Sequence, residues 1–179
     1  PFHEVIRSNQ AGIQVTPLTP DLAVFDIDAF LAGLRPAEAI AARHTVGLVD
    51  PITADDPHDA VGDGLPETLE EVVSTYGHRW FKLKVAGNVD ADVARLLRIA
   101  SVLDRIDGGY RSTLDGNEQY DSVEGIAELW RRMTETPALA KLVQSILFIE
   151  QPIKRAVALS RPVEALARLK SLEIDESDG

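Results

Sequence analysis

Two lysines two residues apart, Lys82 and Lys84, lie in a short apolar stretch at residues 80–85. Side chains alternate along a β-strand, so both lysines are expected on one face while Phe81 and Leu83 point to the other. In a parallel sheet both faces are covered, and a buried charge without a partner is costly. The pattern therefore predicts that the two lysines face a polar cavity.

Three later apolar runs each end in a carboxylate, at Asp115, Glu150 and Asp175. Active sites of α/β barrels lie at the carboxyl ends of the strands, so we expect these residues beside the two lysines. Three carboxylates with waters or substrate oxygens fill the octahedral oxygen shell that magnesium prefers. With a neutral lysine as base, such a site could remove the proton next to a carboxylate, giving an enediolate that the metal stabilises.

Each feature also has a purely structural interpretation. Paired lysines on a strand are more often solvated, and a carboxylate after a strand is often a turn former. A calcium loop beginning at Asp115 is excluded because Ile126 stands where a bidentate glutamate is needed. The four histidines show no ligand spacing, and neither the dinucleotide-binding nor the P-loop glycine pattern occurs in the sequence.

Strand and helix patterns alternate strictly from residue 44 onward, which predicts a parallel sheet covered by helices. We expect strands near residues 45–49, 80–85, 111–115, 146–150 and 172–175. The fold class is therefore α/β, a partial (β/α)8 barrel of about five strands. Residues 1–43 are a separate region with a helix near 26–34, for which Asp26 or Asp28 could be the cap. A complete barrel needs eight strands, so we expect the native polypeptide to be longer.

Composition narrows the classes of partner. The net charge of −11 over 179 residues argues against nucleic acid, which is bound by clustered Lys and Arg. No apolar run approaches the ~20 residues that span a bilayer, so no membrane partner is expected. Without cysteine, a metal must bind to oxygen or imidazole. We expect a cytoplasmic protein that acts on a small carboxylate-bearing substrate and, at full length, forms a homo-oligomer.

Four motifs in order resemble the signature of the enolase superfamily, and within it the mandelate racemase and muconate lactonizing enzyme family. They are Lys82-Leu83-Lys84, Asp115-Gly116-Asn117, Ile149-Glu150-Gln151-Pro152 and Asp175-Glu176-Ser177. The resemblance covers about residues 44–179. It implies that this region is the first part of the barrel domain and that residues 1–43 are a remnant of the N-terminal capping domain and its linker.

The resemblance also implies a role for each motif residue. Magnesium would be bound by Asp115, Glu150 and Asp175. Lys84 would be the acid/base catalyst, Lys82 would contact the substrate carboxylate, and Asn117 and Glu176 would line the site. The implied reaction is that of a racemase, cycloisomerase, epimerase or dehydratase, an isomerase or lyase whose opposing base would lie beyond Gly179. Gly116 and Glu118 differ from the commoner residues around the first ligand, which leaves the substrate open.

Two other functions fit parts of the pattern. A noncatalytic member of the family, acting as a scaffold or binding protein, would keep the fold without metal-dependent proton exchange. A different magnesium-dependent barrel lyase, acting on keto acids, would not need Lys82 and Lys84 on one strand.

Overall fold

The computed structural model describes residues 24–158 and 162–176, and the chain divides into two units, residues 1–41 and 42–179. In the first unit, helix α2 (Ile27–Gly33) begins where the Asp26 carboxylate accepts a hydrogen bond from the Ala29 amide at 2.9 Å. Of the two predicted caps, it is therefore Asp26 that caps the helix. Whether this unit belongs to a capping domain stays a prediction.

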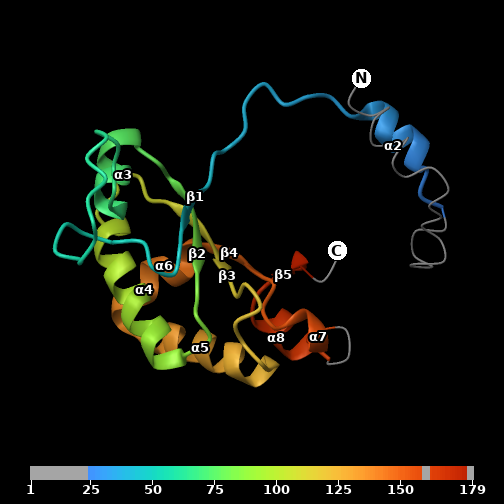
Figure 1. Ribbon diagram of the computed structural model, residues 1–179. Coiled ribbons are helices and arrows are strands. Elements are labelled where there is room, and N and C mark those ends of the chain that lie inside the picture. Colours follow the sequence, from blue (N-terminus) through green and yellow to red (C-terminus); the bar gives the residue numbers. More distant parts are fainter. Residues whose placement is uncertain (1–23, 159–161, 177–179) are drawn as a thin grey trace. The chain divides into compact units, whose positions relative to one another are not determined.

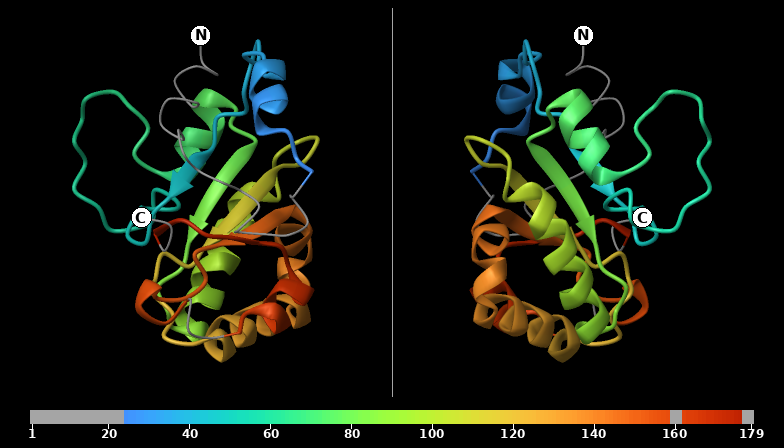
Figure 2. Two further views of the ribbon diagram at one scale, coloured as in Figure 1. Left: turned by 90° about the vertical axis from the view of Figure 1, so that its right-hand side faces the viewer. Right: turned by 90° about the vertical axis from the view of Figure 1, so that its left-hand side faces the viewer.

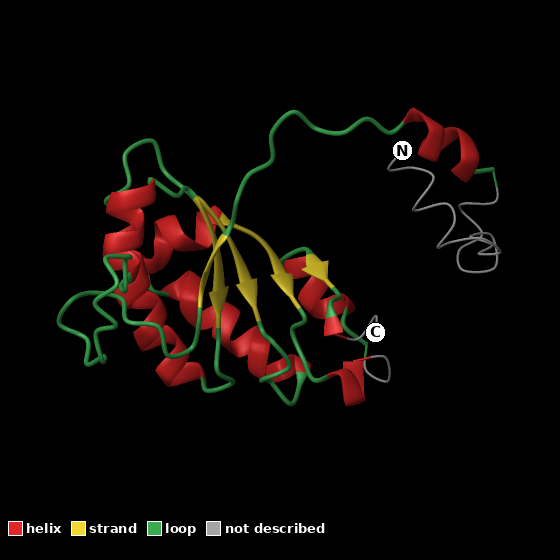
Figure 3. Cartoon of the chain, turned by 45° about the horizontal axis from the view of Figure 1, so that its top comes forward, coloured by secondary structure: helices red, strands yellow, loops and turns green. Residues whose placement is uncertain are grey.

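The second unit is built on one five-stranded sheet in which every neighbouring pair of strands is parallel (Figure 1; Figure 3). The strands are β1 (His44–Val46), β2 (Trp80–Lys84), β3 (Arg111–Asp115), β4 (Ile146–Glu150) and β5 (Leu172–Glu173). Their spatial order is their order in the sequence. The predicted α/β class and the parallel pairing are confirmed.

The two outer strands are shorter than predicted. β1 ends at Val46 because the Asp50 carboxylate accepts a hydrogen bond from the Gly47 amide at 2.7 Å, which folds the chain into a turn and leaves Val49 exposed. β5 ends at Glu173, and the Asp175 amide then donates to the Gln151 side chain at 3.2 Å instead of continuing a ladder. Both ends are set by side chains that lie outside the apolar runs.

Local capping decides where the connecting helices begin. α3 (Leu69–Tyr76) starts at a capping box of Thr68 and Glu71. Asn88 caps α4 (Val89–Leu103), and Ser122 caps α5 (Val123–Glu135). The remaining helices are η2 (Pro137–Leu139), α6 (Ala140–Ser145), α7 (Arg155–Ala158) and α8 (Glu164–Leu169).

Helices α3, α4, α5 and α6 lie on the same side of the sheet (Figure 1; Figure 2). A doubly wound sheet reverses its strand order and places helices on both faces, whereas consecutive parallel strands with helices on one side form a sector of a (β/α) barrel. The sequential order of the five strands therefore indicates the barrel type. Among the described residues, no helix is long and apolar enough to cross a bilayer.

The face of β2 that meets these helices is its apolar one. Phe81, Leu83 and Val85 are at most 1% exposed, as the alternation predicts. They belong to a core that includes Leu96, Ile99 and Leu103 of α4 and Ile126, Leu129 and Met133 of α5. The other face of the strand is left for Lys82 and Lys84.

Gly116 is the residue at which the loops after β3 and β4 come into contact. A Cβ atom at this position would lie 2.6 Å from the carbonyl oxygen of Gln151 and 3.0 Å from the Cα of Pro152. The Gly116 amide also donates to the carbonyl of Glu150 at 2.9 Å. Because Gly116 has no side chain, the ends of the two strands can approach each other this closely.

We predict that Gly116→Ala lowers the free energy of unfolding by about 1–3 kcal/mol, because the added methyl group must push two backbones apart. Chemical denaturation followed by circular dichroism measures this. Gly33→Ala is the control, since a Cβ there meets nothing within 4 Å and Gly33 lies in the other unit, and it should leave the unfolding transition of residues 42–179 unchanged. Equal stability of the Gly116 variant and wild type would show that the loops do not depend on this contact.

Candidate active site

The pairing of the three inner strands brings the predicted site residues on β2, β3 and β4 next to one another. Lys82 is in register with Thr113, and Lys84 with Asp115, across β2 and β3. Asp115 is in register with Glu150 across β3 and β4. Residues paired in register point to the same face of a sheet, so these five side chains share the face opposite the helices. The predicted meeting of lysines and carboxylates at the carboxyl ends of the strands is present for Asp115 and Glu150.

Lys82 lies between the two carboxylates. Its ammonium is 2.5 Å from Oε1 of Glu150 and 2.9 Å from Oδ2 of Asp115. The side chains of Asp115 and Glu150 are only 2% and 5% exposed, so this shared cation is what allows two neighbouring buried carboxylates. Burial lowers the pKa of Lys82, but the hydrogen bonds to Glu150 and Asp115 and their charges outweigh it, and the pKa is raised. Lys82 therefore stays protonated.

Lys84 has different surroundings. Its ammonium donates a hydrogen bond to Oδ1 of Asn117 and lies 3.9 Å from Oδ2 of Asp115. Asn117 in turn donates from Nδ2 to Oε1 of Glu176 at 2.9 Å. The two residues predicted to line the site are therefore joined to Lys84 in one chain of hydrogen bonds. Its side chain is 29% exposed, against 15% for Lys82, so it is the more accessible amine.

Backbone strain is concentrated in the loops that follow the two carboxylates. Among the described residues, Asn117, Glu118 and Gln151 are the non-glycine residues with positive φ, at 44°, 62° and 35°. Such conformations are uncommon and are found at sites where the surroundings impose them. At Asn117 the Asp115 side chain accepts the backbone amide hydrogen at 2.8 Å. Glu118 is turned toward Arg155, which holds its carboxylate through two hydrogen bonds at 2.7 and 2.8 Å and lowers its pKa to about 2.

Two of the three predicted magnesium ligands fit a hard divalent cation. Asp115 and Glu150 offer carboxylate oxygens from adjacent strand ends. Asp175 lies two residues beyond β5 and is exposed. Within residues 24–158 and 162–176, no three acidic or histidine side chains are grouped so that they could hold a metal ion. The ligand set of Asp115, Glu150 and Asp175 thus stays a prediction, of which the structure brings together the first two.

Arg43 reaches the same site and was not among the predicted residues. Its Nη1 donates to Oγ1 of Thr113 at 2.8 Å and lies 3.3 Å from Oε2 of Glu150. Alternation along the strand could have pointed to Arg43. Thr45 is in register with Lys82, and Arg43 lies two residues before Thr45, so it falls on the same face of the sheet. That signal requires the strand register, which the sequence pattern does not provide.

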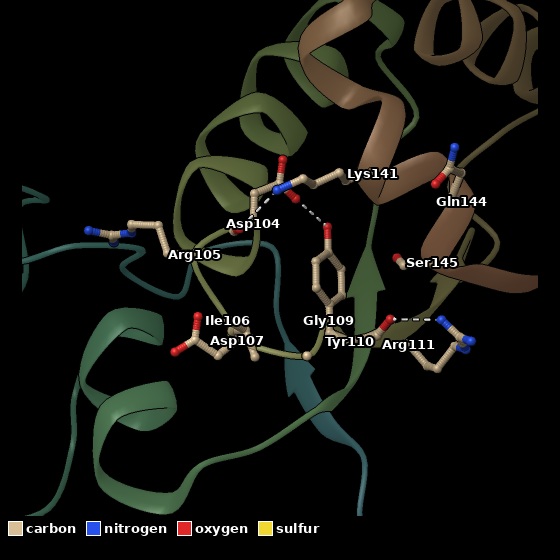
Figure 4. A pocket seen from close by; sticks show the side chains of 11 residues that line it. Asp104, Arg105, Ile106, Asp107, Gly109, Tyr110, Arg111, Lys141, Gln144 and Ser145 are labelled. Carbon is tan, nitrogen blue, oxygen red and sulfur yellow. Dashed lines mark hydrogen bonds between the residues drawn. The ribbon is translucent and has the colours of Figure 1, made fainter.

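A cavity of about 410 Å³ lies at the other end of β3 (Figure 4). There the Tyr110 hydroxyl donates to Oδ1 of Asp104 at 2.8 Å, and Lys141 donates to the Asp104 carbonyl at 3.3 Å. Tyr110 precedes Asp115 by five residues, which in a strand is roughly 16 Å. The cavity is therefore separate from the site at the carboxyl ends of the strands.

No protein-family model matches the chain, and no curated protein matches it. Solved structures do resemble it. A muconate cycloisomerase from Pseudomonas fluorescens is 25% identical with a TM-score of 0.43, over 60% of this chain and 27% of that one. A mandelate racemase/muconate lactonizing protein from Herpetosiphon aurantiacus is 25% identical with a TM-score of 0.44, over 60% and 28%. A muconate lactonizing enzyme from Pseudomonas putida is 21% identical with a TM-score of 0.42, over 59% of this chain and 26% of that one.

The chain thus spans about a quarter of the length of these solved structures. They are proteins of the kind that the four sequence motifs resemble.

We predict that Lys82→Met lowers the free energy of unfolding by about 3 kcal/mol at pH 8, because two buried carboxylates lose their shared cation. The folded-state pKa of Lys82 lies above the ordinary 10.5. The ammonium's stabilising effect is therefore complete below the ordinary, unfolded-state pKa of 10.5 and is lost as the pH rises through the folded-state pKa.

Chemical denaturation from pH 8 to pH 11 measures the difference in free energy of unfolding between wild type and Lys82→Met. We expect this difference to shrink at the alkaline end. Lys141→Met, which removes an exposed lysine, is the control and should show a small difference at every pH. A difference between wild type and Lys82→Met that stays constant to pH 11 would contradict the assignment of the effect to the ammonium.

Proposed function

We propose that this chain carries part of the active site of a magnesium-dependent enzyme that removes the proton alpha to a substrate carboxylate. The product of that step is an enediolate, and the overall reaction would be an isomerisation or an elimination, as in a racemase, epimerase, cycloisomerase or dehydratase. The observation that carries the proposal is the convergence of four side chains at the carboxyl ends of three strands: Lys84, Asp115 and Glu150 are paired in register, and the Lys82 ammonium contacts both carboxylates.

Asp115 and Glu150 would hold the divalent cation, with Asp175 as the proposed third ligand. When bound there, the cation would supply positive charge for the oxygens of an enediolate. The chain's own part is to place a protonated Lys82 against both carboxylates at a site that is almost closed to water. The raised pKa of Lys82 and its contacts to both carboxylates support this.

Lys82 can serve the carboxylates and a substrate together. An ammonium has three hydrogens to donate, and two of them are directed to Glu150 and Asp115. The third hydrogen is available to a substrate carboxylate. This is the role that we propose for Lys82, and it requires that Lys82 remain charged throughout the reaction.

Lys84 would be the base. A neutral amine retains two hydrogens and one lone pair, so it can donate to Asn117 while its lone pair accepts the α-proton. Glu176 accepts from Nδ2 of Asn117 and so keeps Oδ1 turned toward Lys84. We propose that Asn117 and Glu176 orient the amine as well as line the substrate pocket.

The role of Lys84 is tested by α-proton exchange. A panel of α-substituted carboxylic acids is incubated with the protein and Mg²⁺ in D₂O, and deuterium at the α-carbon is followed by NMR. Loss of a general base costs about 10²–10⁴-fold in rate, so Lys84→Ala should exchange at least about a hundredfold more slowly. Lys141→Ala, an exposed lysine at the opposite end of β3, should exchange like wild type. Exchange by Lys84→Ala at the wild-type rate would exclude Lys84 as the base.

Metal binding is tested separately by calorimetry with Mg²⁺ in the absence of substrate. We expect heat of binding for wild type and its loss in Glu150→Gln, because the amide keeps the size of the side chain but removes the charge. Glu164→Gln changes an exposed glutamate of α8 in the same way and should bind as wild type does. Undiminished binding by Glu150→Gln would place the metal elsewhere.

A further inference from the structure

The Glu150 carboxylate is held by two cations, Lys82 on β2 and Arg43 just before β1. Oε1 lies 2.5 Å from the Lys82 ammonium, and Oε2 lies 3.3 Å from Nη1 of Arg43. The same Nη1 donates to Oγ1 of Thr113 at 2.8 Å, which fixes the guanidinium over β3. Both oxygens of the proposed metal ligand are therefore in contact with positive charge.

This arrangement leaves little attraction for a further cation. Lys82 contacts both carboxylates, Arg43 contacts Glu150, and the Lys84 ammonium lies farther away, 3.9 Å from Oδ2 of Asp115. A divalent cation that approached these two carboxylates would meet two positive groups at short range, and such repulsion is strong where water is largely excluded. One of the two groups must withdraw before Glu150 can bind a metal.

Arg43 is the group that can withdraw. Lys82 is 15% exposed and is shared by both carboxylates, whereas Arg43 is 35% exposed and touches only one of them, at the longer distance. A guanidinium does not lose its proton in proteins, so Arg43 cannot become neutral in place and has to move. It precedes the first residue of β1, and its side chain is long enough to swing away without changing the strand.

We propose that Arg43 is a positioning residue that holds Glu150 in the metal-free protein, and that a divalent cation binds at Asp115 and Glu150 only by displacing it. The inference rests on the proposed function, because it concerns the same metal site. It assigns to Arg43 the control of metal affinity, a role separate from proton abstraction by Lys84.

The test is calorimetric titration of the substrate-free protein with Mn²⁺ or Mg²⁺. Removing the competing charge in Arg43→Gln should tighten binding by about tenfold, in line with the loss of one unit charge near the site. Arg43→Lys keeps the charge and should bind close to wild type. Arg105→Gln removes an arginine from an exposed pair with Glu70 and is the matched control, with unchanged affinity expected.

Thr113→Val provides a second variant of nearly the same shape. It removes the hydroxyl that anchors the guanidinium but leaves every charge in place. Arg43 should then leave Glu150 more readily, and metal binding should tighten by a smaller factor than in Arg43→Gln. This variant keeps the proposal testable if Arg43→Gln fails to fold.

A merely structural role for Arg43 predicts the opposite sign, because Glu150 would lose a support and bind metal more weakly. Weaker or unchanged affinity in both Arg43→Gln and Thr113→Val would overturn the proposal while leaving the proposed function in place, provided that wild type binds metal through Glu150. If neither wild type nor Arg43→Gln binds a divalent cation, both the inference and the proposed metal site are wrong.

Discussion

Two buried carboxylates stand side by side in this protein because cations contact them, Arg43 at Glu150 and, between the two carboxylates, the Lys82 ammonium. Without it, Asp115 and Glu150 would repel each other in surroundings that water hardly reaches. The position of Lys82 depends in turn on the register of β2 against β3 and of β3 against β4. The chemistry of the site is therefore fixed by backbone pairing before any loop contributes to it.

The same register is enforced from the opposite face of the sheet. Phe81 and Leu83 are fully buried against the helices, and a slip of one residue would exchange them with Lys82 and Lys84. That exchange would put two ammonium groups into the apolar core, at a cost that no local contact could offset. The alternation of side chains along β2 therefore determines both the packing of the core and the geometry of the site.

The sequence pattern predicts the inner strands better than the outer ones for a physical reason. β3 and β4 have the predicted bounds because each is paired with a strand on both sides up to its last residue, Asp115 or Glu150. β1 and β5 stop early because side chains outside the runs, Asp50 and Gln151, take the next backbone amides. Of the site residues, those on β2, β3 and β4 follow from alternation. The contact of Arg43 with Glu150 joins residues 107 positions apart, and the link from Asn117 to Lys84 requires a left-handed backbone, so neither could be predicted.

We propose that Asp115 and Glu150 form a divalent-cation site between strands that also present Lys82 and Lys84. The most direct measurement is a crystal structure with Mn²⁺ and the anomalous scattering of the metal. The account predicts a peak at about 2.0–2.2 Å from an oxygen of each carboxylate, with Lys84 on the substrate side. An anomalous peak elsewhere, or crystals grown in saturating Mn²⁺ that show no anomalous peak between Asp115 and Glu150, would contradict it.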